Sequence, residues 1–200
     1  MTIRPYRPSD FDAVHQICAA TADAGSPMTG LPDPDIVGHV FAGPYVTLEP
    51  DLAFVHEDAD GVAGYVIAAL DTAAFETRWR AEWSPRFVES HPPPAVSADP
   101  AADAWLREML HNPASPAPVA FPEFPSHLHI DLLARARGNG NGRRLLDALF
   151  DALRAKGSPG VHLLVVQSNT NAIAFYRAVG FTELPTPLPG LRAFGMPLSR

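Results

Sequence analysis

The side chains best suited to proton transfer stand together in one short stretch, HLHID, at positions 127–131. His127, His129 and Asp131 alternate there with apolar residues. If the stretch is a β-strand, the alternation places two imidazoles and one carboxylate on the same face. Both groups accept and donate protons in enzymes, so this face is a candidate for general acid–base chemistry. Three polar side chains facing inward on a central strand are also hard to explain by packing alone.

A glycine-rich loop follows this stretch closely. The residues RGNGNGRR run from Arg137 to Arg144, and a leucine-rich helical pattern begins among them. A helix N-terminus offers unpaired N–H groups and the positive end of the helix dipole, and glycines let the backbone approach an anion closely. The loop therefore predicts a phosphate site, to which the arginines add positive charge. An ordinary flexible turn between a strand and a helix is the alternative.

Two familiar nucleotide motifs do not fit this loop. A P-loop requires a Lys-Ser or Lys-Thr pair after its last glycine, and Arg143 and Arg144 stand in that position. A dinucleotide fingerprint is followed about 20 residues later by an acidic residue at the end of the next strand. The corresponding stretch, from His162 to Gln167, contains no carboxylate. Both kinds of site are therefore excluded.

A third pattern fits the loop and a later helix together. Residues 137–142 read R-x-x-G-x-G, and residues 169–181 read N-x-x-A-x-x-F-Y-x-x-x-G-F. In this order and spacing the two elements resemble the acetyl-CoA signature of the GCN5-related N-acetyltransferase (GNAT) superfamily. The matched positions are Arg137, Gly140, Gly142, Asn169, Ala172, Phe175, Tyr176, Gly180 and Phe181.

The resemblance extends over nearly the whole chain. Residues 2–25, residues 43–65 and the long segment before position 127 look like the bacterial acetyltransferases related to the C-terminal domain of human O-GlcNAcase. That human domain is regarded as a pseudo-acetyltransferase whose cofactor loop has lost the glycine motif. Because this sequence keeps the motif, the resemblance implies that it binds acetyl-CoA.

The resemblance also implies where acetyl-CoA lies. The pantetheine arm runs between two diverging strands, 127–134 and 161–167, where backbone groups of one strand pair with its amides. The pyrophosphate rests on the backbone amides of positions 138–143. Either Asn169 bonds the cofactor, or it caps the helix that begins there, or both. The cofactor-binding residues implied in this way are Leu132, Leu133, Arg137, Gly138, Asn139, Gly140, Asn141, Gly142, Arg143, Asn169 and Tyr176.

Three residues are candidates for catalysis of direct acetyl transfer. Tyr176 matches the family tyrosine that assists the departing thiolate; alternatively, it is only the amphipathic edge of a core helix. The base that takes the proton of the acceptor amine is Asp131, directly or through water, or else His129. A β-bulge where the strands diverge would change which residues share this face.

Two functions follow from these residues. The first is an acetyl-CoA-dependent N-acetyltransferase that acts on a primary amine of a small molecule or an exposed chain. The second is a non-catalytic module that binds acetyl-CoA or a protein partner. The acidic chain favours cationic acceptors such as amines, aminoglycosides or lysines.

The elements around these residues predict an α/β (α+β) fold. A strand–helix–strand–helix order in the second half predicts a parallel crossover, and the GNAT resemblance adds a mixed central sheet splayed between two parallel strands, with helices on both faces. We expect one domain over 1–200, in which an irregular Pro-rich insertion at about 72–125 forms either a wall or lid over a pocket or extra cover for the core. Expected strands cover 2–7, 127–134, 161–167 and 191–198, a hairpin covers 52–71, and helices follow Ser9 and cover 35–43, 101–112, 141–156 and 169–181.

Composition limits the class of protein. A net charge of −7 argues against non-specific binding of DNA or anionic membranes. No apolar run approaches the roughly 18 residues of a membrane span, and the N-terminal stretch lacks the apolar core of a signal peptide. A single cysteine, Cys18, fits a reducing cytoplasm. An edge strand near the C-terminus would allow two chains to pair as a homodimer.

The remaining candidates are weaker. Glu123 either lines the acceptor pocket or belongs to a rigid turn in the sequence FPEFP. No metal site is expected, because the other histidines lack the spacing of metal ligands. They are His15, His39, His56, His91, His111 and His162.

Overall fold

The structure is a computed structural model that describes residues 2–95, 101–114, 121–186 and 188–198. Its strands form one sheet in the order β1-β2-β3-β4-β5-β7-β6. Every neighbouring pair is antiparallel except β4 and β5, which are parallel. The expected mixed α/β fold is confirmed. The strands are β1 (Thr2–Pro5), β2 (Ala53–Asp58), β3 (Gly61–Ala69), β4 (Ser126–Leu132), β5 (Gly160–Val166), β6 (Thr182–Leu184) and β7 (Leu191–Pro197).

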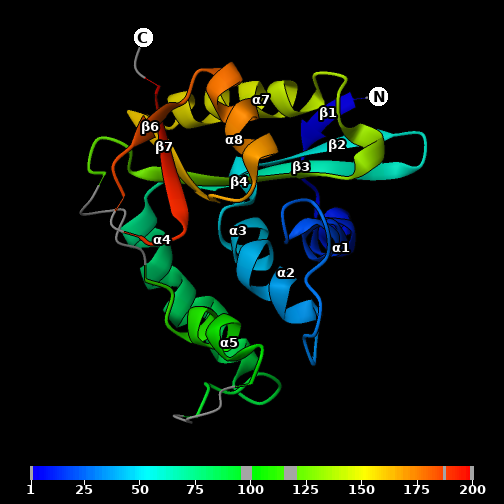
Figure 1. Ribbon diagram of the computed structural model, residues 1–200, viewed down its shortest axis with the longest axis vertical. Helices are drawn as coiled ribbons and strands as arrows, with labels where there is room; N and C mark the ends of the chain where they lie inside the picture. Colours follow the sequence, from blue (N-terminus) through cyan, green and yellow to red (C-terminus); the bar gives the residue numbers. More distant parts are fainter. Residues whose placement is uncertain (1, 96–100, 115–120, 187, 199–200) are drawn as a thin grey trace.

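Helices cover both faces of the sheet (Figure 1). We call the side under α7 and α8 the upper face and the side under α1, α2 and α3 the lower face. The segment with α4 and α5 continues outward from the lower face. The helices are α1 (Phe11–Thr21), α2 (Asp35–Phe41), α3 (Gly43–Leu48), α4 (Thr72–Arg78), α5 (Ala104–His111), α7 (Asn141–Ala155) and α8 (Thr170–Val179).

The upper face carries an apolar core. The apolar residues of α7 recur at helical spacing, so one side of the helix is buried against the sheet. β4 contributes Leu128, Ile130 and Leu132 to this core, as strand alternation predicts. The buried residues of α7 in it are Leu145, Leu146, Leu149, Phe150 and Leu153.

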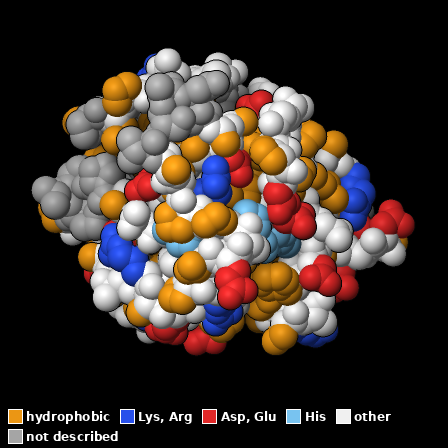
Figure 2. Space-filling view, turned by 90° about the horizontal axis from the view of Figure 1, so that it is seen from below, with side chains coloured by type: hydrophobic (Ala, Val, Ile, Leu, Met, Phe, Trp, Pro, Cys, Tyr) orange, Lys and Arg blue, Asp and Glu red, His pale blue; other side chains and the backbone are white. Residues whose placement is uncertain are grey.

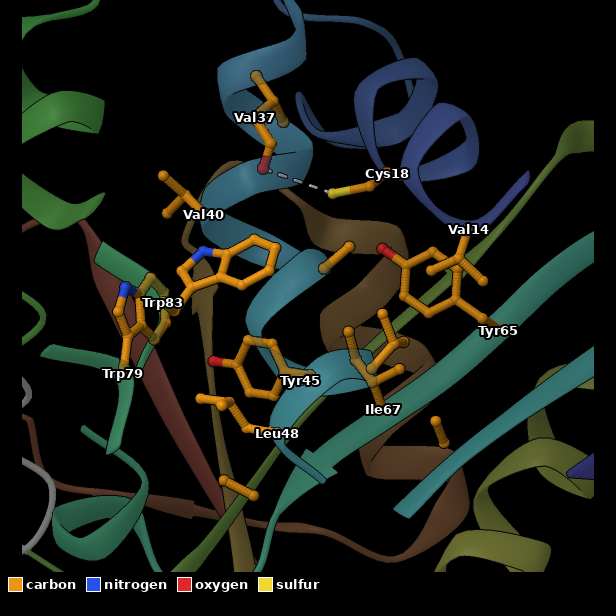
Figure 3. Close-up of a cluster of buried hydrophobic side chains, with 14 of the residues drawn as sticks. Val14, Cys18, Val37, Val40, Tyr45, Leu48, Tyr65, Ile67, Trp79 and Trp83 are labelled. Carbon is orange, nitrogen blue, oxygen red and sulfur yellow. Dashed lines mark hydrogen bonds between the residues drawn. The ribbon is translucent and has the colours of Figure 1, made fainter. Parts of the chain in front are cut away.

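The lower face carries a second core that is richer in aromatic residues (Figure 3). Tyr65 points from β3 toward α1, where the Cys18 thiol donates a weak hydrogen bond to the carbonyl of Val37 over 3.8 Å. Trp79 and Trp83 reach this core from the predicted insertion and are at most 4% exposed. These two tryptophans therefore belong to the core of the lower face.

The insertion is more regular than its proline content suggested. After α4 the chain continues as a π-helical turn (Trp79–Trp83) and a 3₁₀ turn (Ser84–Phe87). The structure also contains α3 and β6, for which the sequence analysis expected no element. Residues 96–100 and 115–120 of the expected insertion lie outside the described residues. In the described part of the chain, no helix is both long and apolar enough to span a membrane.

Candidate functional site

The centre of the sheet opens between β4 and β5. The two strands pair only at Ser126–Val161 and His127–His162, whereas β4 pairs with β3 all the way to Leu132. Beyond His127, no strand in the described part of the chain pairs with the facing edges of β4 and β5, so their backbone groups face a gap. This divergence is the splayed parallel pair that the sequence analysis expected.

The glycine-rich loop connects the end of β4 to α7. Gly138 and Gly140 have φ angles of +85° and +72°, in the left-handed region that favours glycine, and a Cβ at either position would meet nothing within 4 Å. Among the described residues, no protein acceptor receives a hydrogen bond from the backbone amides of positions 138–143. These N–H groups remain available to a ligand at the N-terminus of a helix of 15 residues.

Arg137 holds the loop in place. Its Nε donates to the carbonyl of Leu132 at 2.9 Å, and Nη2 donates to the carbonyl of Gly25 at 3.3 Å. These hydrogen bonds tie the loop to the end of β4 and to the segment at Gly25, and we call them the clamp. The positive charge of Arg137 stays beside the loop. Arg143 is exposed and forms an ion pair with Asp147 at 2.8 Å, one turn along α7.

Asn141 also has a structural role. It is 1% exposed, its Nδ2 donates to the carbonyl of Ala136 at 2.8 Å, and its Oδ1 accepts from Arg144. Its side chain therefore fixes the start of α7, and only its backbone amide faces a ligand position. Asn139 is exposed at the tip of the loop.

The end of β4 corrects one expectation. The amide of Leu133 donates to Ala63 at 2.9 Å, and its carbonyl accepts from Ala136 at 2.9 Å. Both backbone groups of Leu133 are therefore engaged within the protein and do not face the gap. Because backbone direction alternates along a strand, the groups of Leu132 face the gap, and Arg137 occupies its carbonyl.

Helix α8 brings Asn169 and Tyr176 to the upper side of the gap. The side chain of Asn169 accepts from the amide of Ala172 at 3.1 Å, so the capping role that the sequence allowed is present. Tyr176 is 8% exposed and packs against Phe181 and other aromatic rings. Burial raises the pKa of Tyr176, and the carboxylate of Asp131 raises it further. The two predicted catalytic residues thus lie within electrostatic range of each other.

The start of α7 packs closely on α8. A Cβ built on Gly142 would approach the ring of Phe175 to 3.0 Å, tighter than most real contacts. The third glycine of the loop therefore allows the two helices to approach, whereas the first two set the backbone conformation. The paired motifs of the sequence meet at this contact.

The lower side of β4 carries a chain of hydrogen bonds. The hydroxyl of Thr72 lies 2.8 Å from the carbonyl of Pro125 and 2.8 Å from Nδ1 of His127. The hydroxyl of Tyr45 lies 2.8 Å from Nε2 of His127 and 3.0 Å from Nε2 of His129. Both imidazoles share this face with Asp131, so the predicted alternation is present and no bulge interrupts it.

Both imidazoles are neutral at pH 7. Burial lowers the pKa of His127 well below its ordinary value, and the neighbouring His129 and His162 lower it further. Burial, with a smaller effect of His162, lowers the pKa of His129 to about 4.

Asp131 lies farther along β4 in a different setting. The hydroxyl of Tyr65 donates to its Oδ2 at 2.7 Å. Burial raises the pKa of Asp131, and the hydrogen bonds from Tyr65 and Thr21 oppose that shift. The predicted carboxylate is therefore present, but a buried tyrosine occupies one of its oxygens.

Other predicted residues are not part of this site. Glu123 is exposed in a turn in which the amide of Phe124 donates to Phe121, so the rigid-turn interpretation fits it. His162 donates from Nδ1 to the carbonyl of Phe124 at 2.7 Å and is satisfied within the fold.

A second histidine group lies between α1 and α2. Nε2 of His15 and Nδ1 of His39 are 3.1 Å apart, and His91 pairs with Asp33 at 3.0 Å. The face seen from below shows histidine side chains near its middle, with charged side chains around them (Figure 2). Within the described residues, no group of three or more potential ligands is arranged to hold a metal ion.

Sequence reasoning missed Tyr45, Thr72 and Tyr65. Each is the partner of a predicted polar residue on β4, and none stands in a motif. The available signal was indirect: buried imidazoles and carboxylates require hydrogen-bond partners, so the inward-facing residues of β4 implied polar side chains opposite them.

The arrangement joins an anion-binding helix end, a gap with free strand edges and a set of proton-transfer groups. Such a site would suit a phosphate-bearing ligand with an extended arm that enters the gap.

Comparison with known proteins agrees with this geometry. The model of the acetyltransferase (GNAT) family matches residues 32–181. Protein O-GlcNAcase from Rattus norvegicus is 27% identical over 184 residues, which is 92% of this chain but 20% of the relative, and the Mus musculus protein matches equally. The chain thus spans about a fifth of the length of these curated relatives.

Solved structures extend the match. The crystal structure of SsHAT is 39% identical, covers 100% of this chain and 98% of its own, and superposes with a TM-score of 0.92. The structure of yncA from Salmonella typhimurium with its cofactor acetyl-CoA has a TM-score of 0.57 at 18% identity and covers 99% of this chain and 94% of its own. At that identity the second match shows the shared fold alone.

Proposed function

The chain belongs to the GNAT acetyltransferase family, and from this premise we propose that it binds acetyl-CoA and transfers the acetyl group directly to a primary amine. One observation carries the proposal: among the residues that the structure describes, the backbone amides of positions 138–143 have no protein acceptor, and they stand at the N-terminus of α7, beside the gap between β4 and β5. A diphosphate is the chemical group that such a helix end holds best.

The residues around the loop fit this cofactor. The backbone of Gly138, Asn139, Gly140, Asn141, Gly142 and Arg143 would hold the diphosphate, with the charges of Arg137 and Arg143 nearby. The backbone amide of Leu132, at the free edge of β4, would donate to an amide carbonyl of the pantetheine arm, as it would to an added strand. When bound, acetyl-CoA supplies the activated acetyl group.

Tyr176 would assist the departing thiolate. Its side chain is buried within electrostatic range of Asp131, and its raised pKa keeps the hydroxyl protonated, so it can donate a hydrogen bond or a proton. A phenol has a pKa about 1.5 above that of a thiol, so full transfer costs roughly 2 kcal/mol before the site shifts either value. A strong hydrogen bond to the developing thiolate lowers this barrier.

The proton of the amine has two candidate acceptors, Asp131 and His129. Both lie on the lower face of β4 at the gap, half-buried. The acceptor itself is an amine of a small molecule or of an exposed chain. The proposal includes no nucleic-acid or membrane partner. The buried free thiol of Cys18 fits a reducing compartment, for which we propose the cytoplasm.

A second function has one observation in its favour. The O-GlcNAcase relatives match this chain over a region that is a small part of their length. A module that binds acetyl-CoA or a protein partner without catalysis would also keep the fold. Such a module releases no thiol in the presence of any amine, and Tyr176→Phe leaves its properties unchanged.

Two glycine variants test cofactor binding. Gly140→Ala and Gly157→Ala both place a methyl group on a left-handed residue with open space around it, so each strains the backbone by about 1–2 kcal/mol. Only Gly140 lies beside the amides of the loop. Titration calorimetry should show a dissociation constant for acetyl-CoA at least tenfold higher in Gly140→Ala and unchanged in Gly157→Ala. Wild-type protein that binds no acetyl-CoA would refute the proposed function.

A further inference from the structure

The hydrogen bonds below β4 have a fixed direction. A carbonyl only accepts, so the hydroxyl of Thr72, 2.8 Å from the carbonyl of Pro125, gives its single proton to that oxygen. The contact between Thr72 and Nδ1 of His127 then has only one possible donor, the imidazole. A neutral imidazole carries one N–H, so Nε2 of His127 is an unprotonated acceptor.

The direction continues to the next histidine. Nε2 of His127 accepts from the hydroxyl of Tyr45, which thereby uses its only proton. The second contact of Tyr45, at 3.0 Å, must be donated by Nε2 of His129. His129 is therefore the Nε2–H tautomer, and its Nδ1 carries a free lone pair.

Nδ1 of His129 is open to a ligand. Within the described residues this nitrogen has no hydrogen-bond partner. It is also not fully buried, so a ligand can reach it. The ring of Phe41, whose centre lies 6.0 Å from that of the imidazole, offers no hydrogen-bonding side-chain atom. Burial and His162 keep the ring neutral by lowering its pKa to about 4, so the lone pair is present throughout the physiological range.

The position of His129 along β4 separates it from Asp131. The strands still pair at His127, so the gap begins next to His129 and widens toward Leu132 and the glycine-rich loop. A ligand with its diphosphate on the loop directs its far end, which bears the thioester, to the narrow end of the gap. His129 lies at this end, whereas Asp131 lies nearer the loop and already accepts from Tyr65 at 2.7 Å.

We propose that Nδ1 of His129 receives the proton of the acceptor amine, and that Tyr45, His127 and Thr72 are positioning residues that hold this nitrogen unprotonated and aimed at the gap. The inference rests on the proposed function and identifies the base, which the family motifs leave open. In the reaction the amine nitrogen forms a bond to the acetyl carbon, and the carbon–sulfur bond breaks.

Protons and electrons balance in this scheme. As the nitrogen attacks, it gains positive charge and its N–H becomes acidic, so even a weakly basic imidazole can take the proton at Nδ1. The sulfur leaves with the electron pair of the broken bond and takes a proton from Tyr176. Exchange with solvent then returns His129 to its neutral form and reprotonates Tyr176.

Activity measurements on matched variants test the assignment. Thiol release from acetyl-CoA with a primary amine should fall roughly 100-fold or more in kcat for His129→Asn, because general bases contribute about that much. Asparagine still accepts a hydrogen bond but takes no proton, so the KM of the amine should change little.

Two tyrosines on the same face form a matched pair. Tyr45 and Tyr65 are 4% and 0% exposed, and each donates to a polar side chain of β4. Tyr45→Phe should lower kcat roughly tenfold by releasing the orientation of His129, while Tyr65→Phe, which releases Asp131 instead, should lower kcat less than Tyr45→Phe does. A larger loss of kcat in Tyr65→Phe than in Tyr45→Phe would overturn the proposal in favour of Asp131. So would a larger loss in Asp131→Asn than in His129→Asn.

Nuclear magnetic resonance gives a readout that does not depend on activity. Long-range proton–nitrogen correlation on the intact protein distinguishes protonated from unprotonated ring nitrogens. We expect protonated Nδ1 in His127 and protonated Nε2 in His129, with both rings neutral down to about pH 5, and a mixed state for His129 in Tyr45→Phe. The opposite tautomer in wild-type His129 would refute the assignment even if the enzyme is active. An inactive wild-type protein with the expected tautomers would instead count against the proposed function.

Discussion

The two faces of β4 are built from alternate residues of one strand, yet they differ in kind. Leu128, Ile130 and Leu132 enter an apolar core on the upper face. His127, His129 and Asp131 face tyrosines and a threonine on the lower face. The upper face of β4 packs into the apolar core, whereas the lower face keeps polar groups that are hydrogen-bonded to neighbouring side chains. On β4 itself, this difference separates the residues that pack into the apolar core from those that we propose for chemistry.

The largest expected effect is on the upper face. Leu128→Asn places an amide without partners in an apolar core and removes a side chain that is 3% exposed. The free energy of unfolding should fall by about 3–4 kcal/mol, since a cavity and an unpaired polar group both contribute. Urea denaturation followed by circular dichroism measures this change.

His129→Leu is the matched change on the lower face. It removes one donor to Tyr45, whose own proton remains bound by His127. The free energy of unfolding should stay within about 1 kcal/mol of wild type, while amine acetylation is lost. Equal destabilisation by the two variants would contradict the division between the faces.

Tyr176→Phe tests the upper face at the point where it meets the gap. Loss of the hydroxyl should lower kcat roughly 100-fold, as expected for an assisting acid, and leave the dissociation constant of acetyl-CoA nearly unchanged. Because the pKa of Tyr176 is raised, its hydroxyl should stay protonated up to about pH 10. The wild-type kcat should therefore not fall through deprotonation of Tyr176 below that pH. Stopped-flow thiol detection over a pH series measures both quantities, and an unaltered kcat would make Tyr176 a packing residue.

The lower face also predicts how stability depends on pH. The pKa of His129 is about 4 in the folded protein against an ordinary value of 6.5. As the pH falls, His129 therefore takes up its proton in the unfolded chain before it does so in the folded protein. The stability that neutral His129 contributes is complete above pH 6.5 and is lost as the pH falls toward 4. The loss is at most about 1.4 kcal/mol for each pH unit in that window. Denaturation at several pH values should show a shallower decline in His129→Leu than in wild type.

The smallest effect concerns the clamp at the end of β4. Arg137→Gln removes the bonds to Leu132 and Gly25, each worth about 1 kcal/mol, and should raise the dissociation constant of acetyl-CoA roughly fivefold. Arg135→Gln is the control, because Arg135 is also exposed and binds Asp58 instead. A similar loss of affinity in both variants would point to general charge rather than to the clamp.

The fold followed from the sequence where local signals were strong. Alternation on β4, the apolar spacing of α7 and the turn between β2 and β3 each predicted an element that the structure contains. The short elements α3 and β6 were missed, because six and three residues carry too little periodicity. The helical run from Thr72 to Phe87 was not predicted, because the whole insertion was judged by its proline content. Only residue 85 within this run is proline, and the other prolines of the insertion follow it.

The site was predictable in its parts but not in their connections. The glycine motif and Tyr176 stand in recognisable patterns, whereas Tyr45 and Thr72 reach β4 from elements far away in sequence. The roles of Arg137 and Leu133 could not be read from the motif either. Their hydrogen bonds to Gly25 and Ala63 depend on how distant loops and strands come together.

The short pairing between β4 and β5 also leaves a signature in exchange with deuterated solvent. Along β4, amides that point to β3 belong to a continuous ladder, while those of Ile130 and Leu132 point into the gap. Neighbouring amides of one strand should therefore exchange at very different rates, fast and slow in turn. A ligand arm that enters the gap as an extra strand would slow only the fast set, so mass-resolved exchange would record its arrival residue by residue.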